Sequence, residues 1–428
     1  MKATTTAISL AVIIIASVCL PSIFSSSADG QQLLQTSKNR DLTIELDMQQ
    51  QLRTRAQLTL PTVGEGPFPA VLLIHGSGAA DMDGYIPPEL SGTETGARIF
   101  WQIAQYLSDR GFVVLRYDKR GVGENATILN PEVFENATVQ QLQRDAEVAL
   151  DVLMQQPEVD RANITLIGIS EGTTIAPRIA AERSDNVKNI VLMGAASQRL
   201  YDIMYANLVN RTILFARELW DDNHDGLLSL QEVQTHPGEY LTVPASSPAV
   251  TATTADNDTA TGNNTMISNI DTVTTSAAAT TTTNTTIGTQ PTTLKQWYPG
   301  LDANNDTLVE IDQELIPFAL ALFEQTAEDP WLQSHREIAP NLIAIESLRP
   351  TTTRILILQG EEDNQTYLEQ ALLLEQKLTQ MKYPDHMLIT YPGLGHTFHP
   401  AQGLLQPLGP IQDYVLADLH AWLKDFDR

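Results

Sequence analysis

The sequence contains a single cysteine among its 428 residues. That residue, Cys19, lies in an apolar N-terminal stretch that we expect to be removed from the mature protein. A mature chain without a thiol has no disulfide bond, no cysteine nucleophile and no thiolate metal site.

Basic side chains are also scarce. The chain has 26 Lys and Arg residues against 52 Asp and Glu residues, which gives a formal net charge of −26. A surface of this sign repels the phosphates of DNA and RNA. Nucleic-acid binding is therefore excluded as a function class.

The N-terminal apolar run is too short to cross a bilayer. It extends for 14 residues from Ala7 to Leu20, whereas a transmembrane helix needs about 20. Lys2 precedes the run and a stretch of small residues ending at Ala28 follows it. This pattern is typical of a secretory signal peptide, here residues 1–28. We expect a secreted protein with no stable membrane span, and an uncleaved N-terminal anchor is the alternative.

Buried strands alternating with helices dominate the rest of the chain. Two alternating segments, 42–50 and 52–60, predict an antiparallel strand pair. Apolar runs separated by helical stretches follow, and strands that are apolar on both faces indicate a mostly parallel sheet covered by helices on both sides. The predicted class is α/β, with runs at 70–74, 112–117, 164–169, 189–194, 354–360 and 386–391.

One interval interrupts this alternation and predicts an insertion at 201–350. Its flanks, 205–220 and 316–325, have the spacing of amphipathic helices. Between them, residues 251–293 contain 18 threonines in 43 positions and no Lys or Arg, a composition that forms no packed core. We interpret 244–293 as a disordered tether whose Asn-x-Ser/Thr sites are candidate glycosylation sites. The core is then expected in two parts, 42–200 and 351–428.

Four short motifs carry the candidate chemistry. Gly168-Ile-Ser-Glu-Gly172 lies between a strand and a helix, where a G-x-S-x-G turn exposes a strained serine. His75-Gly-Ser-Gly78 ends the first buried strand, and its backbone N–H groups can face a developing oxyanion. Asp363 and His396 follow the last two strands, so the chain order is Ser, acid, His.

Together with Leu115-Arg-Tyr-Asp-Lys-Arg-Gly-Val-Gly123, these motifs resemble the α/β-hydrolase superfamily, in particular secreted esterases and serine aminopeptidase-like members. The resemblance implies Ser170 as nucleophile, His396 as general base and Asp363 as the acid that orients it. It also implies an oxyanion hole formed by the backbone N–H groups of Ser77 and Glu171. Met82 and Glu124 depart from residues that relatives often carry, which bears on substrate preference.

Each of these assignments has an alternative in the sequence. His399 is the rival base, and Glu361 and Glu362 are rival acids. His75 is interpreted as a structural loop histidine, and the Lys119-Arg120 pair as a solvated or structural turn.

The insertion contains a pattern typical of an EF-hand calcium loop. Alternate oxygen side chains at positions 1, 3 and 5, a glycine at 6, a backbone carbonyl at 7 and a bidentate carboxylate at 12 surround one cation in such a loop. The first copy supplies Asp221, Asn223, Asp225, Gly226, Leu227 and Glu232 at these positions.

A second, weaker copy begins at Asp302, with Asn304 and Asp306 at positions 3 and 5. Thr307 replaces the glycine and Gln313 occupies position 12, so Glu314 or Glu310 is the candidate carboxylate in a shifted geometry. Calcium is the expected cofactor, and we expect it to order the insertion as a lid over the Ser170 site.

These observations predict a secreted serine hydrolase that cleaves carboxylic esters, with a small-molecule ester or amide as substrate. One alternative is a serine amidase or exopeptidase on the same fold, because the triad is common to both. Another is a non-catalytic calcium-dependent binding protein that uses an inactive hydrolase fold.

Overall fold

The computed structural model describes residues 37–235, 241–244, 295–348, 352–402 and 406–425. The predicted signal peptide, and the predicted tether from residue 245 onward, lie outside these residues. The chain forms two compact units, one comprising the sequence up to Leu208 and from Phe323 onward, the other Val209–Leu322. The second unit spans fewer residues than the insertion expected at 201–350.

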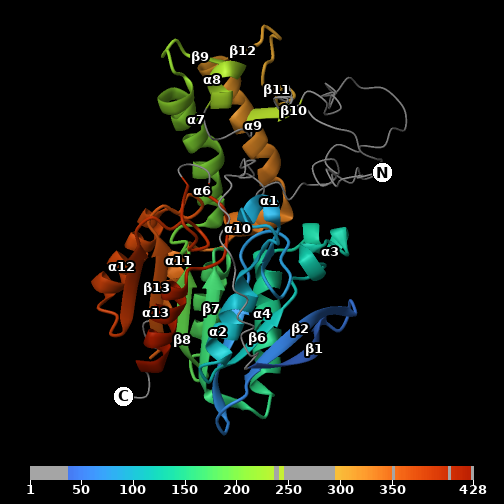
Figure 1. Ribbon diagram of the computed structural model, residues 1–428, viewed down its shortest axis with the longest axis vertical. Coiled ribbons are helices and arrows are strands. Elements are labelled where there is room, and N and C mark those ends of the chain that lie inside the picture. Colours follow the sequence, from blue (N-terminus) through green and yellow to red (C-terminus); the bar gives the residue numbers. More distant parts are fainter. Residues whose placement is uncertain (1–36, 236–240, 245–294, 349–351, 403–405, 426–428) are drawn as a thin grey trace, which may run out of the picture. The chain divides into compact units, whose positions relative to one another are not determined.

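An eight-stranded sheet forms the centre of the first unit, with strand order β1-β2-β6-β3-β7-β8-β13-β14 (Figure 1). β1 pairs antiparallel with β2, and β2 with β6, while every other pairing in this sheet is parallel. The predicted mostly parallel sheet with an antiparallel start is therefore confirmed. The strands are β1 (Ser37–Asp47), β2 (Leu52–Pro61), β3 (Phe68–Ile74), β6 (Val113–Tyr117), β7 (Val159–Ile169), β8 (Val187–Met193), β13 (Arg354–Gly360) and β14 (His386–Tyr391).

Helices cover both faces of this sheet (Figure 1). On one face, α2 (Ile99–Ser108) and α13 (Asp413–Lys424) pack against inward residues such as Val71 and Leu73. On the other face, the strand residues Leu72 and Ile74 pack against helices that include α4, α5 and α12. Successive strand residues thus enter opposite cores, which explains why the strands are apolar throughout. These three helices span Val139–Met154, Gly172–Glu182 and Leu368–Met381.

Short elements complete the first unit. A small antiparallel pair, β4 with β5, precedes α2. The remaining elements are β4 (Tyr85–Ile86), α1 (Pro88–Ser91), β5 (Ala97–Arg98), a 3₁₀ turn (Glu124–Ala126), α3 (Pro131–Glu135), α6 (Leu200–Tyr205), α10 (Pro330–Glu337) and α11 (Asn341–Glu346).

The second unit has its own apolar core, built around Trp220, Leu228, Trp297 and Val309. Two short antiparallel pairs organise it, β9 with β12 and β10 with β11. Pro244, which the sequence assigned to the tether, ends β10. Its elements are α7 (Arg211–Phe215), a π-helical turn (Ala216–Trp220), β9 (Leu227–Ser229), α8 (Leu230–Thr235), β10 (Thr242–Pro244), β11 (Lys295–Trp297), β12 (Leu308–Glu310) and a second π-helical turn (Ile311–Leu315). Two further elements cross its boundaries, a π-helical turn (Ala206–Asn210) and α9 (Ile316–Ala327).

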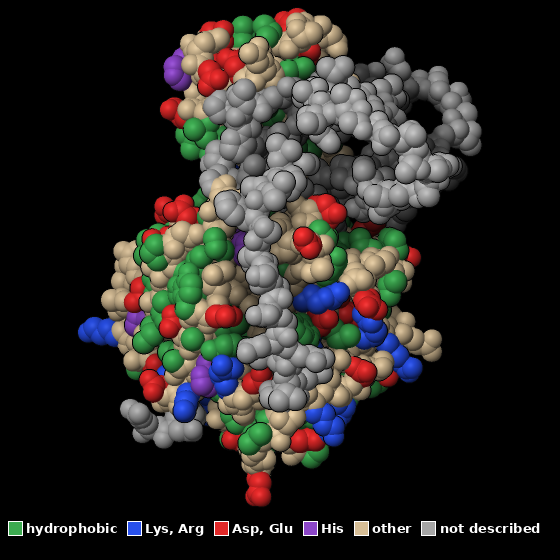
Figure 2. All heavy atoms as spheres, viewed as in Figure 1, with side chains coloured by type: hydrophobic (Ala, Val, Ile, Leu, Met, Phe, Trp, Pro, Cys, Tyr) green, Lys and Arg blue, Asp and Glu red, His purple; other side chains and the backbone are tan. Residues whose placement is uncertain are grey.

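Two surface properties bear on function. Within the described ranges, no helix combines the length and the apolar character that a bilayer span requires. Figure 2 shows carboxylate side chains distributed over the visible surface, as the excess of Asp and Glu over Lys and Arg leads us to expect.

Candidate active site

Ser170 occupies a left-handed turn between β7 and α5. Its φ is 53°, a conformation that is uncommon for a residue with a side chain. A Cβ added at Gly168 would lie 2.3 Å from the carbonyl oxygen of Gly172, and one at Gly172 would lie 2.4 Å from the carbonyl oxygen of Ile74. Both positions of the G-x-S-x-G turn therefore require glycine, and close packing against the end of β3 holds the strained serine in place.

His396 and Asp363 form a direct hydrogen bond, with His396 Nδ1 donating to Asp363 Oδ2 over 2.8 Å. Both side chains are buried. The same carboxylate accepts from Gln359 Nε2 at 3.0 Å and from the backbone N–H groups of Gln365 and Thr366 at 2.8 and 2.9 Å. Burial raises the pKa of Asp363, but the charge of His396 and these hydrogen bonds outweigh it and hold the pKa below its ordinary value. Asp363 is thus held as a carboxylate facing the imidazole.

Ser170 and His396 contact adjacent residues at the end of β8. The backbone N–H of Ser170 donates to the carbonyl of Met193 at 2.9 Å. The next residue, Gly194, has a φ of 62°, and a Cβ there would lie 3.1 Å from His396 Cε1. Since Ser170, Asp363 and His396 follow three parallel strands, β7, β13 and β14, all three lie at the carboxyl edge of the sheet.

The rival residues engage other partners. His399 Nδ1 donates to the carbonyl of Pro410 at 3.0 Å. Glu361 Oε1 accepts from Thr390 Oγ1 at 2.7 Å, and Glu362 is exposed. The imidazole–carboxylate pair at this edge is therefore His396 with Asp363.

His75 lies in the core behind the site. Its ring stacks on Phe100 at a centroid distance of 4.6 Å, and Nε2 donates to the carbonyl of Tyr117. Burial lowers the pKa of His75 to about 3, so the ring is neutral. A neutral ring with these contacts has a structural role.

The two amides expected in the oxyanion hole lie on the segments that flank Ser170. Ser77 belongs to the loop after β3, and a Cβ at its neighbour Gly76 would lie 3.2 Å from Ser170 Cβ. Glu171 directly follows Ser170. Among the described residues, neither N–H donates to a backbone carbonyl. Both N–H groups therefore remain candidates for the predicted oxyanion hole beside Ser170.

The two calcium-type loops of the second unit have matching hydrogen bonds. In the first, the Asp221 carboxylate accepts from the N–H groups of Asp225 and Gly226 at 3.1 and 2.9 Å. In the second, the Asp302 carboxylate accepts from the N–H groups at the same offsets, Asp306 and Thr307, at 3.2 and 3.0 Å. Asn223 and Asn304 each accept from the N–H two residues later, and Asp225 and Asp306 from the N–H groups of Leu227 and Leu308.

The loops also pair with each other. Leu228 and Val309, which occupy the eighth position of each loop, are partners in the β9–β12 pair. Thr307 has a φ of 76° where the first loop has Gly226 at 82°. Threonine in this conformation is strained, because its branched Cβ crowds the backbone. We expect the second loop to be the less stable of the two.

Glu314, and not Gln313, folds back into the second loop. Its Oε1 accepts from the N–H of Ala303 at 2.8 Å and its Oε2 from the N–H of Glu310 at 2.9 Å. The π-helical turn Ile311–Leu315 accommodates the extra residue that this register requires. In the first loop Glu232 Oε2 accepts from the N–H of Ser229 at 2.9 Å.

No group of three or more His, Cys, Asp or Glu side chains in the described ranges is arranged as a metal site.

Comparison with known proteins gives a match to the family model of the alpha/beta hydrolase fold over residues 69–236. This span contains Ser77, Ser170 and Glu171, and it ends before Asp363. The chain has the α/β-hydrolase fold.

Two curated relatives match parts of this chain. Esterase EstD of Thermotoga maritima is 36% identical over 189 residues, which cover 43% of this chain and 40% of that protein. Acyl-coenzyme A thioesterase 6 of Mus musculus is 28% identical over 194 residues, which cover 44% and 38% of the two chains. The matches thus span about two-fifths of each relative. A solved structure, hypothetical protein PA2218 from Pseudomonas aeruginosa, covers 94% of this chain and 99% of its own at 17% identity and a TM-score of 0.47.

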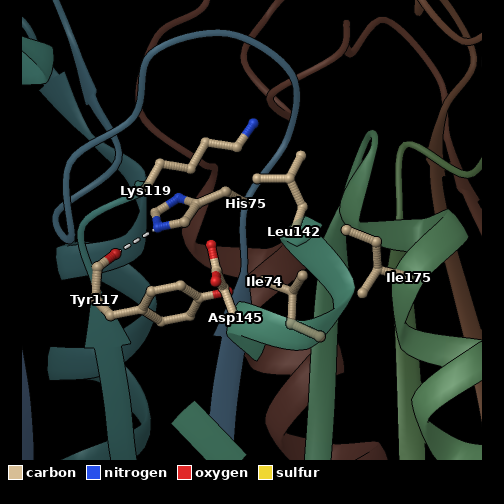
Figure 3. A pocket seen from close by; sticks show the side chains of 7 residues that line it. All are labelled: Ile74, His75, Tyr117, Lys119, Leu142, Asp145 and Ile175. Carbon is tan, nitrogen blue, oxygen red and sulfur yellow. Dashed lines mark hydrogen bonds between the residues drawn. The ribbon is translucent and has the colours of Figure 1, made fainter. Parts of the chain in front are cut away.

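A small cavity lies beside the candidate site. It is lined by Ile74, His75, Tyr117, Lys119, Leu142, Asp145 and Ile175, and Figure 3 shows these side chains with the hydrogen bond from His75 to Tyr117. Its volume is about 10 Å³, enough for about one water molecule at most. This cavity is therefore no substrate pocket.

Sequence reasoning missed several polar residues beneath the hydrolase site. Lys119 and Arg120 are both buried, so of the two alternatives, a solvated or a structural turn, the structure supports the structural one. Arg120 binds Asp145 through two hydrogen bonds of 2.7 Å. Trp331 and His335 on α10 both bind Glu171, and Gln359 binds Asp363. No local motif indicates the contacts of Trp331 and His335, because their partner lies far away in the sequence. Gln359 is close to Asp363 in the sequence, but their contact depends on the conformation of the turn between them.

The helix that carries Trp331 and His335 begins at a carboxyl group with a raised pKa. Asp329 is 2% exposed, and its side chain accepts from the N–H of Trp331 at 2.8 Å. Burial, with a smaller contribution from the charge of Glu135, raises its pKa to about 6 despite that hydrogen bond. The ordinary value is 3.8, so folding favours the protonated form, and stability is lost as the pH rises through this interval.

Asp329→Asn is therefore expected to stabilise the protein at pH 7 by about 2 kcal/mol, because asparagine keeps the helix-capping oxygen without the charge. The free energy of unfolding, from urea denaturation at pH 4 and pH 7, tests this. The difference between variant and wild type should shrink towards zero at pH 4. A difference that is the same at both values would show that the charge of Asp329 is not its source.

Proposed function

We propose that this chain is a secreted serine hydrolase that cleaves carboxylic esters through an acyl-enzyme. The observation that carries the proposal is the buried hydrogen bond between His396 Nδ1 and Asp363 Oδ2 at the sheet edge where Ser170 lies half-buried in its turn. A carboxylate that holds Nδ1–H leaves Nε2 free to accept a proton.

In the proposed reaction, His396 Nε2 takes the proton of Ser170 Oγ while Oγ attacks the ester carbonyl carbon. The carbonyl oxygen becomes an oxyanion that accepts hydrogen bonds from the N–H groups of Ser77 and Glu171. Collapse of this intermediate breaks the bond to the alkoxy oxygen, which leaves as an alcohol with the proton from His396. Water then attacks the acyl-enzyme by the same route and releases the carboxylic acid.

The similarity to an esterase and to an acyl-coenzyme A thioesterase supports an oxygen or sulfur ester as substrate. An amide or peptide substrate is the second candidate, because the triad is common to both reactions. The predicted signal peptide at residues 1–28 supports export.

Labelling with a fluorophosphonate tests the proposal, because this reagent forms a covalent bond only with an activated serine. We expect one label per chain at Ser170 and none in Ser170→Ala. Parallel assays with 4-nitrophenyl acyl esters and aminoacyl 4-nitroanilides then separate esterase from amidase. A wild-type protein that takes no label would favour the non-catalytic binding protein instead.

We further propose that the two loops of the second unit bind calcium. The donor set consists of carboxylate and amide oxygens at alternate positions, which suits Ca²⁺. The matched hydrogen bonds of the two loops and the Leu228–Val309 pairing support a paired arrangement. Glu232 and Glu314 would supply the closing carboxylates.

Addition of calcium is expected to raise the melting temperature. With a Kd of about 10⁻⁴ M, typical of extracellular modules, 10 mM Ca²⁺ would stabilise the folded second unit by about 2.7 kcal/mol. Scanning calorimetry in 10 mM Ca²⁺ and in EDTA tests this, with 10 mM Mg²⁺ as a control for ionic strength. Glu232→Gln should lose most of the calcium-dependent shift, whereas Glu218→Gln, outside both loops, should keep it. An identical melt in calcium and in EDTA would refute calcium binding.

A further inference from the structure

Lys119 is a buried lysine that binds three oxygens around the nucleophile turn. It follows β6, and only 6% of its surface is exposed. Its Nζ donates to the carbonyl of Gly76 at 2.7 Å, to the carbonyl of Gly78 at 3.2 Å and to Glu171 Oε2 at 2.9 Å. An ammonium group has three protons, so all of its donors are used within the protein.

The bond to Gly76 sets the direction of an oxyanion donor. The carbonyl of Gly76 and the N–H of Ser77 belong to one planar trans peptide, in which C=O and N–H point in opposite directions. Because Lys119 holds the carbonyl, the N–H of Ser77 points away from Lys119. A second contact, from the backbone N–H of Lys119 to the carbonyl of Ala80 at 3.0 Å, fixes the far end of the same loop.

Glu171 connects the same ammonium to the second oxyanion donor. Its backbone N–H lies beside Ser170, while its side chain is fully buried and accepts from Lys119. Burial raises the pKa of Glu171, but the Lys119 charge and the hydrogen bond from His335 outweigh it and lower the pKa to about 2. Glu171 is therefore ionised over the whole physiological range, and it pairs with Lys119 throughout.

Helix α10 holds the other oxygen of this carboxylate. Trp331 Nε1 and His335 Nε2 donate to Glu171 Oε1 at 2.6 and 2.8 Å. The two rings pack edge to face at a centroid distance of 5.1 Å. Hydrogen bonds to both oxygens thus hold the Glu171 side chain between Lys119 and α10 and restrain the residue that carries the N–H.

The adjacent charged pair has no such connection. Arg120 binds Asp145, which lines the cavity below Lys119 (Figure 3). Neither of these side chains bonds to the Gly76–Gly78 loop or to Glu171. The contrast between two neighbouring buried ion pairs provides a matched control.

We propose that Lys119 is a positioning residue that joins the Gly76 carbonyl to the Glu171 side chain and so aims the N–H groups of Ser77 and Glu171 at one oxyanion. This inference deepens the proposed hydrolase function and rests on it. Lys119 touches no substrate; its effect is on the geometry of the two donors in the transition state.

Lys119→Met tests the inference, since methionine fills similar space without the ammonium. Loss of one oxyanion donor typically costs about 10²- to 10³-fold in kcat, and we expect a decrease of about 10²-fold here. KM should change by less than about threefold, because the substrate carbonyl is not yet charged in the ground state. Binding of an acyl trifluoromethyl ketone, whose adduct with Ser170 carries an oxyanion, should weaken by the same factor as kcat/KM.

A double variant separates positioning from stability. Lys119→Met alone leaves the Glu171 carboxylate buried without its ammonium, which is expected to lower the melting temperature. Adding Glu171→Gln removes that charge and should restore much of the melting temperature, while kcat stays low because nothing holds the Gly76 carbonyl. Arg120→Met should lower the melting temperature and leave kcat per folded molecule unchanged. All kcat values are normalised to the amount of Ser170 that takes the fluorophosphonate at completion.

The outcomes distinguish this inference from the function on which it rests. If labelled Lys119→Met, or the double variant, has the same kcat as the wild type, the role of Lys119 is overturned and the hydrolase proposal stays intact. So would a loss of kcat with unchanged affinity for the trifluoromethyl ketone. A wild-type protein that takes no label and hydrolyses no ester would overturn both. A selective loss of kcat and ketone affinity, at a restored melting temperature, supports the inference.

Discussion

Replacing Ser170 by alanine is expected to lower kcat for ester hydrolysis by about 10⁵- to 10⁶-fold. The methyl group of alanine cannot attack a carbonyl carbon. A small residual rate remains, because the oxyanion donors and the substrate-binding surface are unchanged. The hydroxyl is the only part of Ser170 that changes, and the hydrogen bond from its N–H to Met193 is kept. The variant should therefore fold as the wild type does, which circular dichroism and melting temperature can establish.

Combined variants sharpen this prediction. The residues of a catalytic triad act as a unit, so His396→Ala and the double variant Ser170→Ala with His396→Ala should fall to nearly the same residual rate. His399→Ala serves as the matched control, because His399 binds Pro410 away from the site. Losses that multiply in the double variant would mean that Ser170 and His396 act independently, which would contradict the proposed mechanism.

The second large effect is expected for Asp363→Asn, which should lower kcat by about 10⁴-fold. The amide has the same shape, but it no longer supplies the negative charge that stabilises the imidazolium. It also presents an N–H to Nδ1, which favours the tautomer with its proton on Nε2, where the proton from Ser170 must go. The five hydrogen bonds to Asp363 come from His396, Gln359, Gln365 and Thr366.

The pH profile of kcat/KM is the second measurement for this variant. The retained activity of Asp363→Asn should rise at high pH, where hydroxide can replace the base. Glu362→Gln removes an exposed carboxylate one residue away and is expected to leave kcat within about twofold. Equal losses in the two variants would show that the local charge matters and not the bond to His396.

Much of the fold follows from local sequence patterns. The buried strands were predictable because both of their faces enter an apolar core. Ser170, Asp363 and His396 were predicted as site candidates for a similar reason, since each follows a strand in a short motif with glycine. The order of such motifs along the chain can be read from the sequence without any three-dimensional distance between them.

The supporting residues were not predictable in this way. Lys119 bonds to Gly76 and Glu171, which lie 43 and 52 positions away, and in the sequence a lysine between Asp118 and Arg120 resembles a solvated one. His335 reaches Glu171 across 164 positions. The register of Glu314 depends on a π-helical turn, whose single extra residue leaves no distinct pattern in the sequence.

The long insertion between the sheet strands β8 and β13 has a consequence for biosynthesis. β8 pairs on one side with β7 and on the other with β13, and residues 194–353 separate β8 from β13 in the chain. At about 5 to 20 residues per second, a ribosome needs roughly 10 to 30 s to synthesise this interval. During that time β8 presents an unpaired apolar edge, which is a template for aggregation. A nascent chain stalled before Arg354 should therefore bind chaperones more strongly than one released after β14 has emerged.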